Sequence, residues 1–406
     1  MSVRAASVFS NRSFSLFFTG QALSFAGDGL RLIAIPLLVY HLTHSALSIG
    51  ITYALELGPF ALFGLLGGSL ADRVDRRRLM IACDFVRFAV LAAFAAGYAL
   101  HILTIWFLYA GIVLISIAAA FFVNAQSPTL PYLLGKERVT QAISALLAAE
   151  QTTQMILPPI GGALFALIGP LPALAINAFT YLCSQVSIAA VHTFGPDEPA
   201  GLPSPRNVLA DIGIGFRWLF GDAAMRTVAG NSLLFNFFGF MCGAVFIPFL
   251  KNDFGASDQV VGYAFGFGAI GAVLGSWFGG RVPRDWPFGK LMIVAYALDG
   301  LLFVPVMFTH NLIVAIFFLA LTNACVLFEI TQIIGWRIRI TPADLVGRVT
   351  AAARLVALVG TVPGAIIGGW LADHHGARFP IIVSGFGYLA LALMISLYPS
   401  MRREAR

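Results

Sequence analysis

Charge is scarce in this sequence. Only 11% of its 406 residues are Asp, Glu, Lys or Arg, whereas 59% are hydrophobic. Water-soluble domains carry about 25% charged residues, so this composition excludes an ordinary soluble fold. The apolar residues form long continuous runs, without the apolar–polar alternation that a membrane β-barrel shows. The sequence therefore predicts an all-α polytopic membrane protein.

Cysteine is also rare, and motifs for catalysis are absent. The four cysteines lie inside apolar runs and form no CxxC pair, so they indicate no disulfide framework. The seven histidines lie at the ends of the runs, and we expect no metal site. The sequence contains no Walker loop and no nucleophile elbow. We therefore expect neither an enzyme nor a bound cofactor.

The net charge of +6 does not indicate nucleic-acid binding, because the positive residues are placed as topology signals. Nearly all Lys and Arg lie in short clusters on alternate connections between the apolar runs; Arg31, Lys251 and Arg378 are the exceptions. Positive connections stay on the cytosolic side of a membrane. We therefore expect a multi-pass protein of a plasma membrane with both termini in the cytosol.

Twelve apolar runs are long enough to cross a bilayer, which takes about 20 residues of helix. The first six lie near residues 15–40, 45–71, 79–100, 103–124, 140–168 and 171–193. The second six lie near residues 227–250, 258–280, 288–309, 311–335, 348–372 and 377–398. These runs predict a six-helix bundle over residues 1–193 and a second over 227–406.

The connection at 194–226 is the longest in the chain. It begins with a Pro-rich linker and continues with Leu209, Ile212, Phe216, Leu219 and Phe220 near helical spacing. An amphipathic helix of this kind lies on a membrane surface with its apolar side in the lipid. We expect such a helix on the cytosolic leaflet.

The two halves are related in sequence. RVTQAISALL from Arg138 matches RVTAAARLVA from Arg348, and GGALFALIG from Gly161 matches GGWLADHHG from Gly368. RVDR from Arg73 likewise matches RVPR from Arg281. Ordered matches at half the chain length indicate a duplication, which predicts two pseudo-symmetric bundles.

The stretch from Gly67 to Met80, GGSLADRVDRRRLM, resembles motif A of the major facilitator superfamily. The residues that fit the motif are Gly68, Asp72, Arg73, Arg76 and Arg77, whereas Asp75 replaces its second glycine. The segments LSFAGDGLRLIAIPLLVYHLTHSAL from Leu23 and LPYLLGKERVTQAISAL from Leu130 resemble the branch with macrolide efflux proteins and the enterobactin exporter.

This resemblance implies a bacterial inner-membrane transporter, a monomer, that exports a small amphipathic or hydrophobic molecule by alternating access. A drug, a macrolide-like compound or a siderophore fits this description, with protons as the coupling ion of an antiport. Two other functions stay open: a nutrient or metabolite importer of the same fold and, from a different class, a lipid scramblase or membrane enzyme.

For motif A, the resemblance implies a conformational latch. Asp72 would contact the cytosolic end of the eleventh span, near Arg348, and hold the inner side shut. Arg73 and Arg77 would add polar contacts. A carboxylate at a helix N-terminus is favourable because that end carries partial positive charge. The second half has Gly280 at the equivalent position, so we expect a one-sided latch.

Charged residues within spans are costly unless they are paired or wetted, so they are candidates for coupling. Asp28 and Arg31 share one face of the first span and either neutralise each other or take part in coupling. Glu56 lies in the middle of the second span with no cation nearby in the sequence. It is either a proton carrier or a neutral packing group. Glu150 adjoins a polar patch, Gln151 to Gln154, and is a further coupling candidate.

Other polar positions are weaker candidates. Asp84 and Arg87 fit a structural ion pair, and Asp299 lies on a helix that does not usually line the cavity. LPPIGG from Leu157 is a degraded antiporter motif, which we interpret as a close helix contact.

The resemblance also implies a central cavity lined by spans 1, 4, 7 and 10. The candidates on these spans are Asn124, Gln126, Asn231, Phe235, Asn236, Phe328, Glu329 and Gln332. A wall rich in Phe suits varied apolar substrates.

Overall fold

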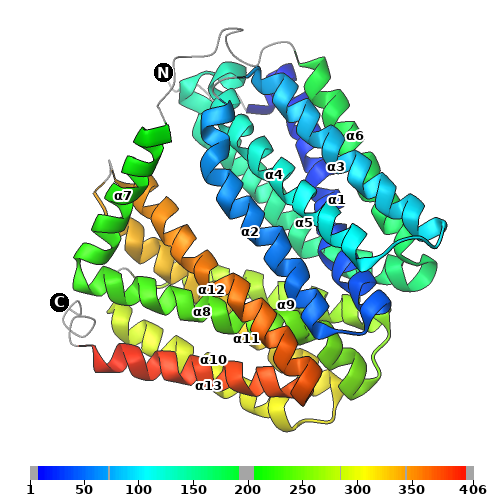
Figure 1. The fold of residues 1–406 in the computed structure, drawn as a ribbon. Helices are drawn as coiled ribbons and strands as arrows, with labels where there is room; N and C mark the ends of the chain where they lie inside the picture. Colours follow the sequence, from blue (N-terminus) through cyan, green and yellow to red (C-terminus); the bar gives the residue numbers. More distant parts are fainter. Residues whose placement is uncertain (1–7, 72–73, 192–204, 284, 343–344, 399–406) are drawn as a thin grey trace. The chain divides into compact units, whose positions relative to one another are not determined.

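The computed structural model describes residues 8–71, 74–191, 205–283, 285–342 and 345–398. All regular secondary structure in these ranges is helical (Figure 1). By their contacts these residues divide into two compact units. Unit 1 comprises Met1–Leu38 and Leu55–Pro205, and unit 2 comprises Val39–Ala54 and Arg206–Arg406. Residues 39–54, which join the first two long helices, thus pack with the second half of the chain.

Six long helices precede the linker: α1 (Arg12–Thr43), α2 (Ala46–Ala71), α3 (Arg76–Ala99), α4 (Ile105–Leu134), α5 (Val139–Ile168) and α6 (Pro170–Ala190). Seven follow it: α7 (Pro205–Gly221), α8 (Ala223–Pro248), α9 (Asp258–Gly279), α10 (Phe288–Phe308), α11 (Leu312–Ile340), α12 (Val346–His375) and α13 (Arg378–Leu397). Short helical turns, η1 (Val8–Ser10), η2 (Lys136–Arg138) and η3 (Phe249–Asp253), lie between or before them.

The predicted all-α polytopic fold is confirmed. Each of the twelve predicted spans corresponds to a long helix, and in the described residues eleven helices are long and apolar enough to cross a membrane. The exception, α5, has 30 residues and is long enough, but it carries the polar patch around Gln151. The predicted span at 103–124 extends further, to Leu134, as α4.

Local sequence signals set the helix ends. The Thr104 hydroxyl accepts a hydrogen bond from the backbone N–H of Phe107 and caps α4, and Asp222 caps α8 in the same way. These side chains satisfy N–H groups that have no partner within the helix. Gly135 and Gly169 have φ values of 78° and 80° and end α4 and α5 in a conformation that other residues avoid.

In unit 1, α3 packs against both α4 and α6 (Figure 1). Phe14 and Phe17 of α1 are fully buried with Met80 of α3 in an apolar cluster. Gly161 of the LPPIGG segment lies against Leu30 of α1, where a Cβ would come within 3.0 Å of the Leu30 carbonyl oxygen. The segment therefore makes the close helix contact that its small residues predict.

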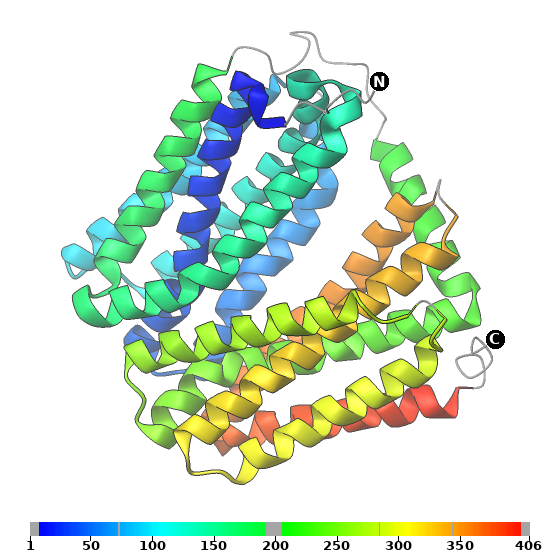
Figure 2. The same cartoon turned by 180° about the vertical axis from the view of Figure 1, so that it is seen from behind.

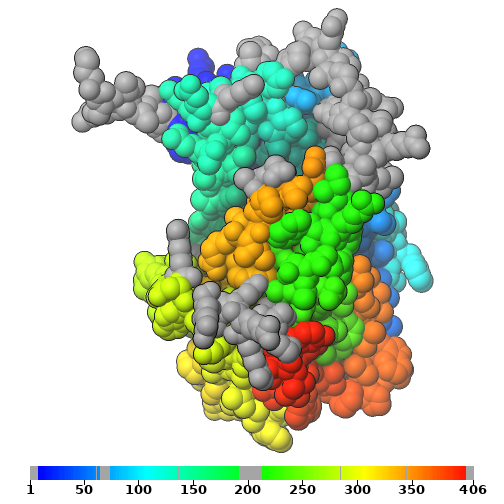
Figure 3. Space-filling model, turned by 90° about the vertical axis from the view of Figure 1, so that its left-hand side faces the viewer, coloured from blue at the N-terminus to red at the C-terminus, as the bar shows by residue number. Residues whose placement is uncertain are grey.

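In unit 2, α8 packs against α12, while α11 contacts both α9 and α10, and α13 contacts α10 (Figure 2). The amphipathic helix predicted within 194–226 is present as α7. Its Gly215 lies against the backbone of Arg348 on α12, and Leu219 is buried. Figure 3 shows the surface of α7 (green) directly beside an orange segment of unit 2. Part of the apolar side of α7 therefore contacts protein.

The contact between α9 and α11 depends on glycine. A Cβ on Gly275 would lie 1.8 Å from the carbonyl oxygen of Ala324, and one on Gly271 would lie 2.0 Å from that of Ala320. The obstructing atoms belong to the backbone and cannot rotate away. The two helices approach this closely only because both positions lack a side chain.

We expect Gly275→Ala to destabilise unit 2, because α9 and α11 must separate to admit the methyl group. Overpacking of this kind costs about 1–3 kcal/mol. Gly230→Ala on α8, where a Cβ would meet nothing within 4 Å, is the matched control. It should be neutral or stabilising. Thermal unfolding of both purified variants tests the expectation, and equal melting temperatures would contradict it.

Candidate functional site

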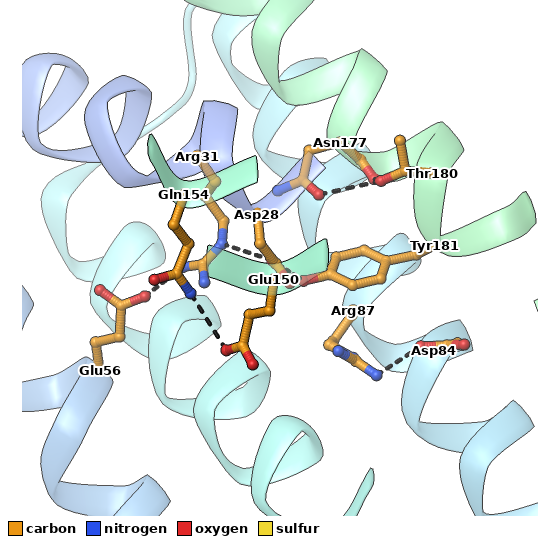
Figure 4. A network of polar contacts seen from close by, with 10 residues as sticks. All are labelled: Asp28, Arg31, Glu56, Asp84, Arg87, Glu150, Gln154, Asn177, Thr180 and Tyr181. Atoms are coloured by element: carbon orange, nitrogen blue, oxygen red, sulfur yellow. Dashed lines mark hydrogen bonds and ion pairs between the residues drawn. The ribbon is translucent and has the colours of Figure 1, made fainter. Parts of the chain in front are cut away.

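The polar centre of unit 1 is a group of three charged side chains, Asp28, Arg31 and Glu56 (Figure 4). The Arg31 Nη1 donates to the Glu56 Oε1 at 2.6 Å, and its Nε lies 3.4 Å from the Asp28 Oδ1. Both carboxylate side chains are 25% exposed and that of Arg31 is 13% exposed. One cation therefore lies between two carboxylates, in a place that solvent reaches.

Glu56 is thus paired, although no cation lies near it in the sequence. Its partner Arg31 lies 25 residues earlier in the sequence, on a neighbouring helix. A pattern within one span does not reveal such a contact. The pairing of Asp28 with Arg31 agrees with their predicted position on one helix face.

Tyr181 of α6 links this group to a second ion pair. Its hydroxyl donates to the Asp28 Oδ1 at 2.5 Å, and its ring lies 4.6 Å from the Arg87 guanidinium carbon (Figure 4). Arg87 donates to the Asp84 carboxylate at 2.6 Å, and both side chains are buried. The predicted Asp84–Arg87 pair is therefore present, with the guanidinium also facing the Phe122 ring at 4.4 Å.

A chain of amides lies between α1, α4 and α6. The Gln126 Nε2 donates to Gln21 at 3.1 Å, and the Gln21 Nε2 donates to the Ser184 hydroxyl at 3.0 Å. Asn124, another cavity candidate, donates to the Gly64 carbonyl of α2 at 2.9 Å. Both predicted side chains on α4 thus fix neighbouring helices through hydrogen bonds.

Glu150 lies on α5 and is half-buried. Its Oε1 accepts a hydrogen bond from Gln154 at 3.2 Å, one helical turn away (Figure 4). Gln151 and Thr152 beside it are exposed. The polar patch predicted on this span therefore has one side open and one side bonded within the helix.

The structure describes motif A only in part, since Asp72 and Arg73 lie outside the described residues. Asp75 begins α3, with its carboxylate accepting from the Arg78 N–H at 3.1 Å. Its φ of −55° needs no glycine. Arg76 lies 5.8 Å from the Tyr132 ring of α4, and Arg77 donates to the Ala189 carbonyl of α6. Both arginines therefore contact helices of their own unit, and Gly68 lies near the end of α2.

An acidic contact of the kind expected of Asp72 occurs in unit 2. The Asp373 carboxylate, near the end of α12, accepts the Ala46 N–H at 2.7 Å and the Leu47 N–H at 3.2 Å. It also accepts the Ser45 hydroxyl at 2.5 Å. These donors form the N-terminus of α2, where a negative charge is favourable. A Cβ on Gly369 would lie 2.5 Å from the Ala46 carbonyl oxygen, so the two backbones touch.

Most of the predicted cavity residues of the second half are buried in unit 2. Phe235 packs between Tyr296 and Tyr388, and Gln332 donates to the Gly279 carbonyl at 2.7 Å. Asn236 donates to the Ser232 carbonyl at 2.7 Å within α8, and Phe328 is half-buried. Asn231 and Glu329 are also buried, at 1% and 0% exposure. The polar atoms of these last two side chains have no hydrogen-bond partner in the described structure.

Two residues with important contacts, Tyr181 and Asp373, were not predicted from the sequence. For Tyr181, the only indication in the sequence is a hydroxyl group in the middle of a predicted span. Asp373 gave a stronger one, because GGWLAD at 368–373 repeats the GGSLAD of motif A at 67–72. The same short sequence therefore precedes both aspartates.

Comparison with known proteins agrees with this architecture. The family model for transmembrane secretion effectors, a branch of the major facilitator superfamily, matches residues 4–405. The chain is 25% identical to the MFS-type transporter YceJ of Bacillus subtilis (strain 168), over 86% of this chain and 85% of YceJ. It is 24% identical to the enterobactin exporter EntS of Escherichia coli O6:K15:H31 (strain 536), over 95% and 91% of the two chains.

Solved transporters share the fold at lower sequence identity. A bacterial homologue of the human lysosomal transporter Spinster, inward-facing and unoccupied, aligns with a TM-score of 0.72 at 14% identity, over 99% of both chains. A bacterial homologue of the iron transporter ferroportin, inward-facing, aligns with a TM-score of 0.72 at 17% identity, over 95% of this chain and 98% of the other. The chain therefore belongs to the transmembrane secretion effector family of the major facilitator superfamily and is a multi-pass membrane transporter.

Proposed function

We propose that this transporter exports a small amphipathic or hydrophobic molecule from the bacterial cytosol by alternating access, in exchange for protons. The family match along nearly the whole chain and the likeness to enterobactin exporters support export. The observation that carries proton exchange is the Asp28–Arg31–Glu56 group, in which two partly exposed carboxyl groups share one guanidinium.

The charge balance of this group suits antiport. With every side chain ionised, two carboxylates face one guanidinium, and the group keeps one negative charge in excess. Burial makes that excess costly, and a proton or the positive end of a substrate removes the cost. Proton and substrate then compete for the same charge, and such competition couples their binding.

The Asp373 contact and the resemblance to motif A support a mechanism for alternating access. With both termini in the cytosol, Asp373 lies at the outer ends of α2 and α12, and the motif A sequence falls on the cytosolic side. Asp373 then favours the state that is closed outside, and Asp72, as motif A implies, the state that is closed inside. In this mechanism Asp373 caps the N-terminus of α2 only while the outer side is shut.

The direction of transport is tested in a host that lacks its own exporters. Cells that express the transporter should accumulate less of at least one macrolide or catecholate siderophore, and accumulation should recover when the proton gradient is collapsed. Higher internal substrate in expressing cells would indicate an importer instead. Lipid movement that persists without a gradient would indicate a scramblase.

The coupling role of Asp28 is tested with Asp28→Asn in proteoliposomes. We expect this variant to lose uphill transport and to keep downhill exchange, because the group no longer carries an excess charge for a proton to neutralise. Coupling free energies of about 1–3 kcal/mol correspond to about 5–150-fold in affinity, so the loss should be large. If this variant still concentrates substrate and Glu56→Gln does not, Glu56 is the coupling residue. Normal pumping by both variants would contradict the proposal.

The outer contact is tested with Asp373→Asn. We expect the tip of the α1–α2 hairpin to separate from α12 more often, since loss of a helix cap costs about 0.5–2 kcal/mol. Spin labels at Leu42 and His375, both exposed, report this distance. Asp285→Asn in an exposed loop is the control. An unchanged distance distribution together with unchanged transport would remove Asp373 from the mechanism.

A further inference from the structure

Unit 2 contains a pair of acidic side chains that the Asp28–Arg31–Glu56 group does not include. Asp299 of α10 and Glu329 of α11 both have 0% exposure. None of their four carboxyl oxygens has a hydrogen-bond partner in the described structure. Helices α10 and α11 pack against each other, and the two carboxyl groups interact electrostatically. Burying such carboxyl groups without a hydrogen-bond partner is costly unless they bind a ligand or a proton.

Among the described residues, no positively charged group interacts with this pair. The titratable groups that interact with it are Tyr296 on α10, Cys325 on α11, Tyr388 on α13 and, for Asp299, Cys242 on α8. The acidic and phenolic groups of α9, Asp258 and Tyr263, lie in its first two turns. No Lys, Arg or His in the described ranges is among the groups that interact with either carboxyl.

The two tyrosines that interact with the pair belong to a cluster of packed aromatic rings. Phe235 lies 5.9 Å from Tyr296 and 5.8 Å from Tyr388, and Phe303 stacks on Tyr388 at 5.8 Å. Tyr296 and Tyr388 are themselves buried. The two carboxyl groups therefore lie in an interior with packed rings and have no exposure to water.

Unit 1 contains a buried carboxyl group that is instead paired with a cation. Asp84 is equally buried, but Arg87 donates to it at 2.6 Å. An ionised carboxylate in a low-dielectric interior is tolerated only with such a partner, and otherwise the group stays neutral. Asp299 and Glu329 have no such partner, so the neutral, protonated form is the one that their surroundings accept.

A proton fits this pair better than a metal ion. Hard cations take six or more oxygen ligands, whereas the groups around the pair supply two carboxyls, two phenols and two thiols. In the described residues no group of three or more His, Cys, Asp or Glu side chains is arranged to hold a metal.

We propose that Asp299 and Glu329 form a second proton-binding site, which keeps its protons while unit 2 is closed and releases them when water enters. On release, a carboxyl O–H bond breaks, the proton passes to water and a carboxylate stays behind. Water must solvate that carboxylate, so release requires the ring-lined site to open. Protonation therefore stabilises the closed arrangement of α8, α10, α11 and α13. A role of this site in transport rests on the proposed export function, whereas proton binding at the site does not.

Infrared difference spectroscopy of the purified protein in lipid nanodiscs tests proton binding directly. At neutral pH the wild type should show C=O stretching bands of protonated carboxyl groups. Glu329→Gln and Asp299→Asn should each remove one component. Asp84→Asn is the control, because Asp84 is equally buried but pairs with Arg87 in unit 1, and its replacement should leave both components in place. Carboxylate bands from Asp299 and Glu329 at neutral pH would overturn the proposal. Conversion of the protonated-carboxyl bands to carboxylate bands on exchange of potassium for sodium in the buffer would also overturn it.

The pH dependence of thermal unfolding provides a second test. The two acids lose their protons when the unfolded chain meets water, so raising the pH should destabilise the wild type more than the Asp299→Asn/Glu329→Gln double variant. If the double variant fails to fold, Glu329→Gln alone should show half of the difference. Parallel pH dependences in wild type and variants would overturn the proposal.

Transport assays separate this inference from the proposed function. In proteoliposomes, Asp299→Asn should move the pH dependence of exchange while leaving substrate affinity within about twofold, because Asp299 is fully buried on α10 and is not among the cavity candidates. A wild type that transports none of the tested substrates would contradict the export proposal, while the infrared bands still decide proton binding. Unchanged pH dependence with altered bands would exclude the site from coupling.

Discussion

Exclusion of water from the interior of the helix bundles is the constraint on which the structure depends. In such an interior a charge persists only beside a partner, and a polar group only with a hydrogen bond. The two units satisfy the constraint differently. Unit 1 pairs its fully buried Asp84 with Arg87. Unit 2 buries Asp299 and Glu329 with no cation nearby among the described residues, which leaves protonation as the way to neutralise them.

The parts of the fold that depend on one segment at a time were predictable from the sequence. Apolar run length predicted the helices, because a bilayer fixes the length of a span. The Asp28–Arg31 and Asp84–Arg87 pairs were predictable because residues three apart share a helix face. The branch of the superfamily was also recognisable, since its loop signatures are short and ordered. Each of these inferences needs only local geometry.

Contacts between helices were not predictable in the same way. Arg31 meets Glu56 because α1 and α2 lie side by side at one particular register, and no pattern within either span fixes that register. Tyr181 reaches Asp28 for the same reason, from a helix about 150 residues later. Asp373 is an intermediate case. Its GGxLAD sequence was visible, but only the structure shows that its carboxylate caps α2.

The contrast between the units has a consequence for how the transporter uses charge. The Asp28–Arg31–Glu56 group is partly exposed, so a proton or a charged substrate reaches it without rearrangement of unit 1. The Asp299–Glu329 pair is fully buried, so in the proposal above its protons exchange only when unit 2 opens. The first group responds to ligand and the second to conformation. A transporter with both resists opening unit 2 while its protons are bound, and this resistance limits proton leakage in the absence of substrate.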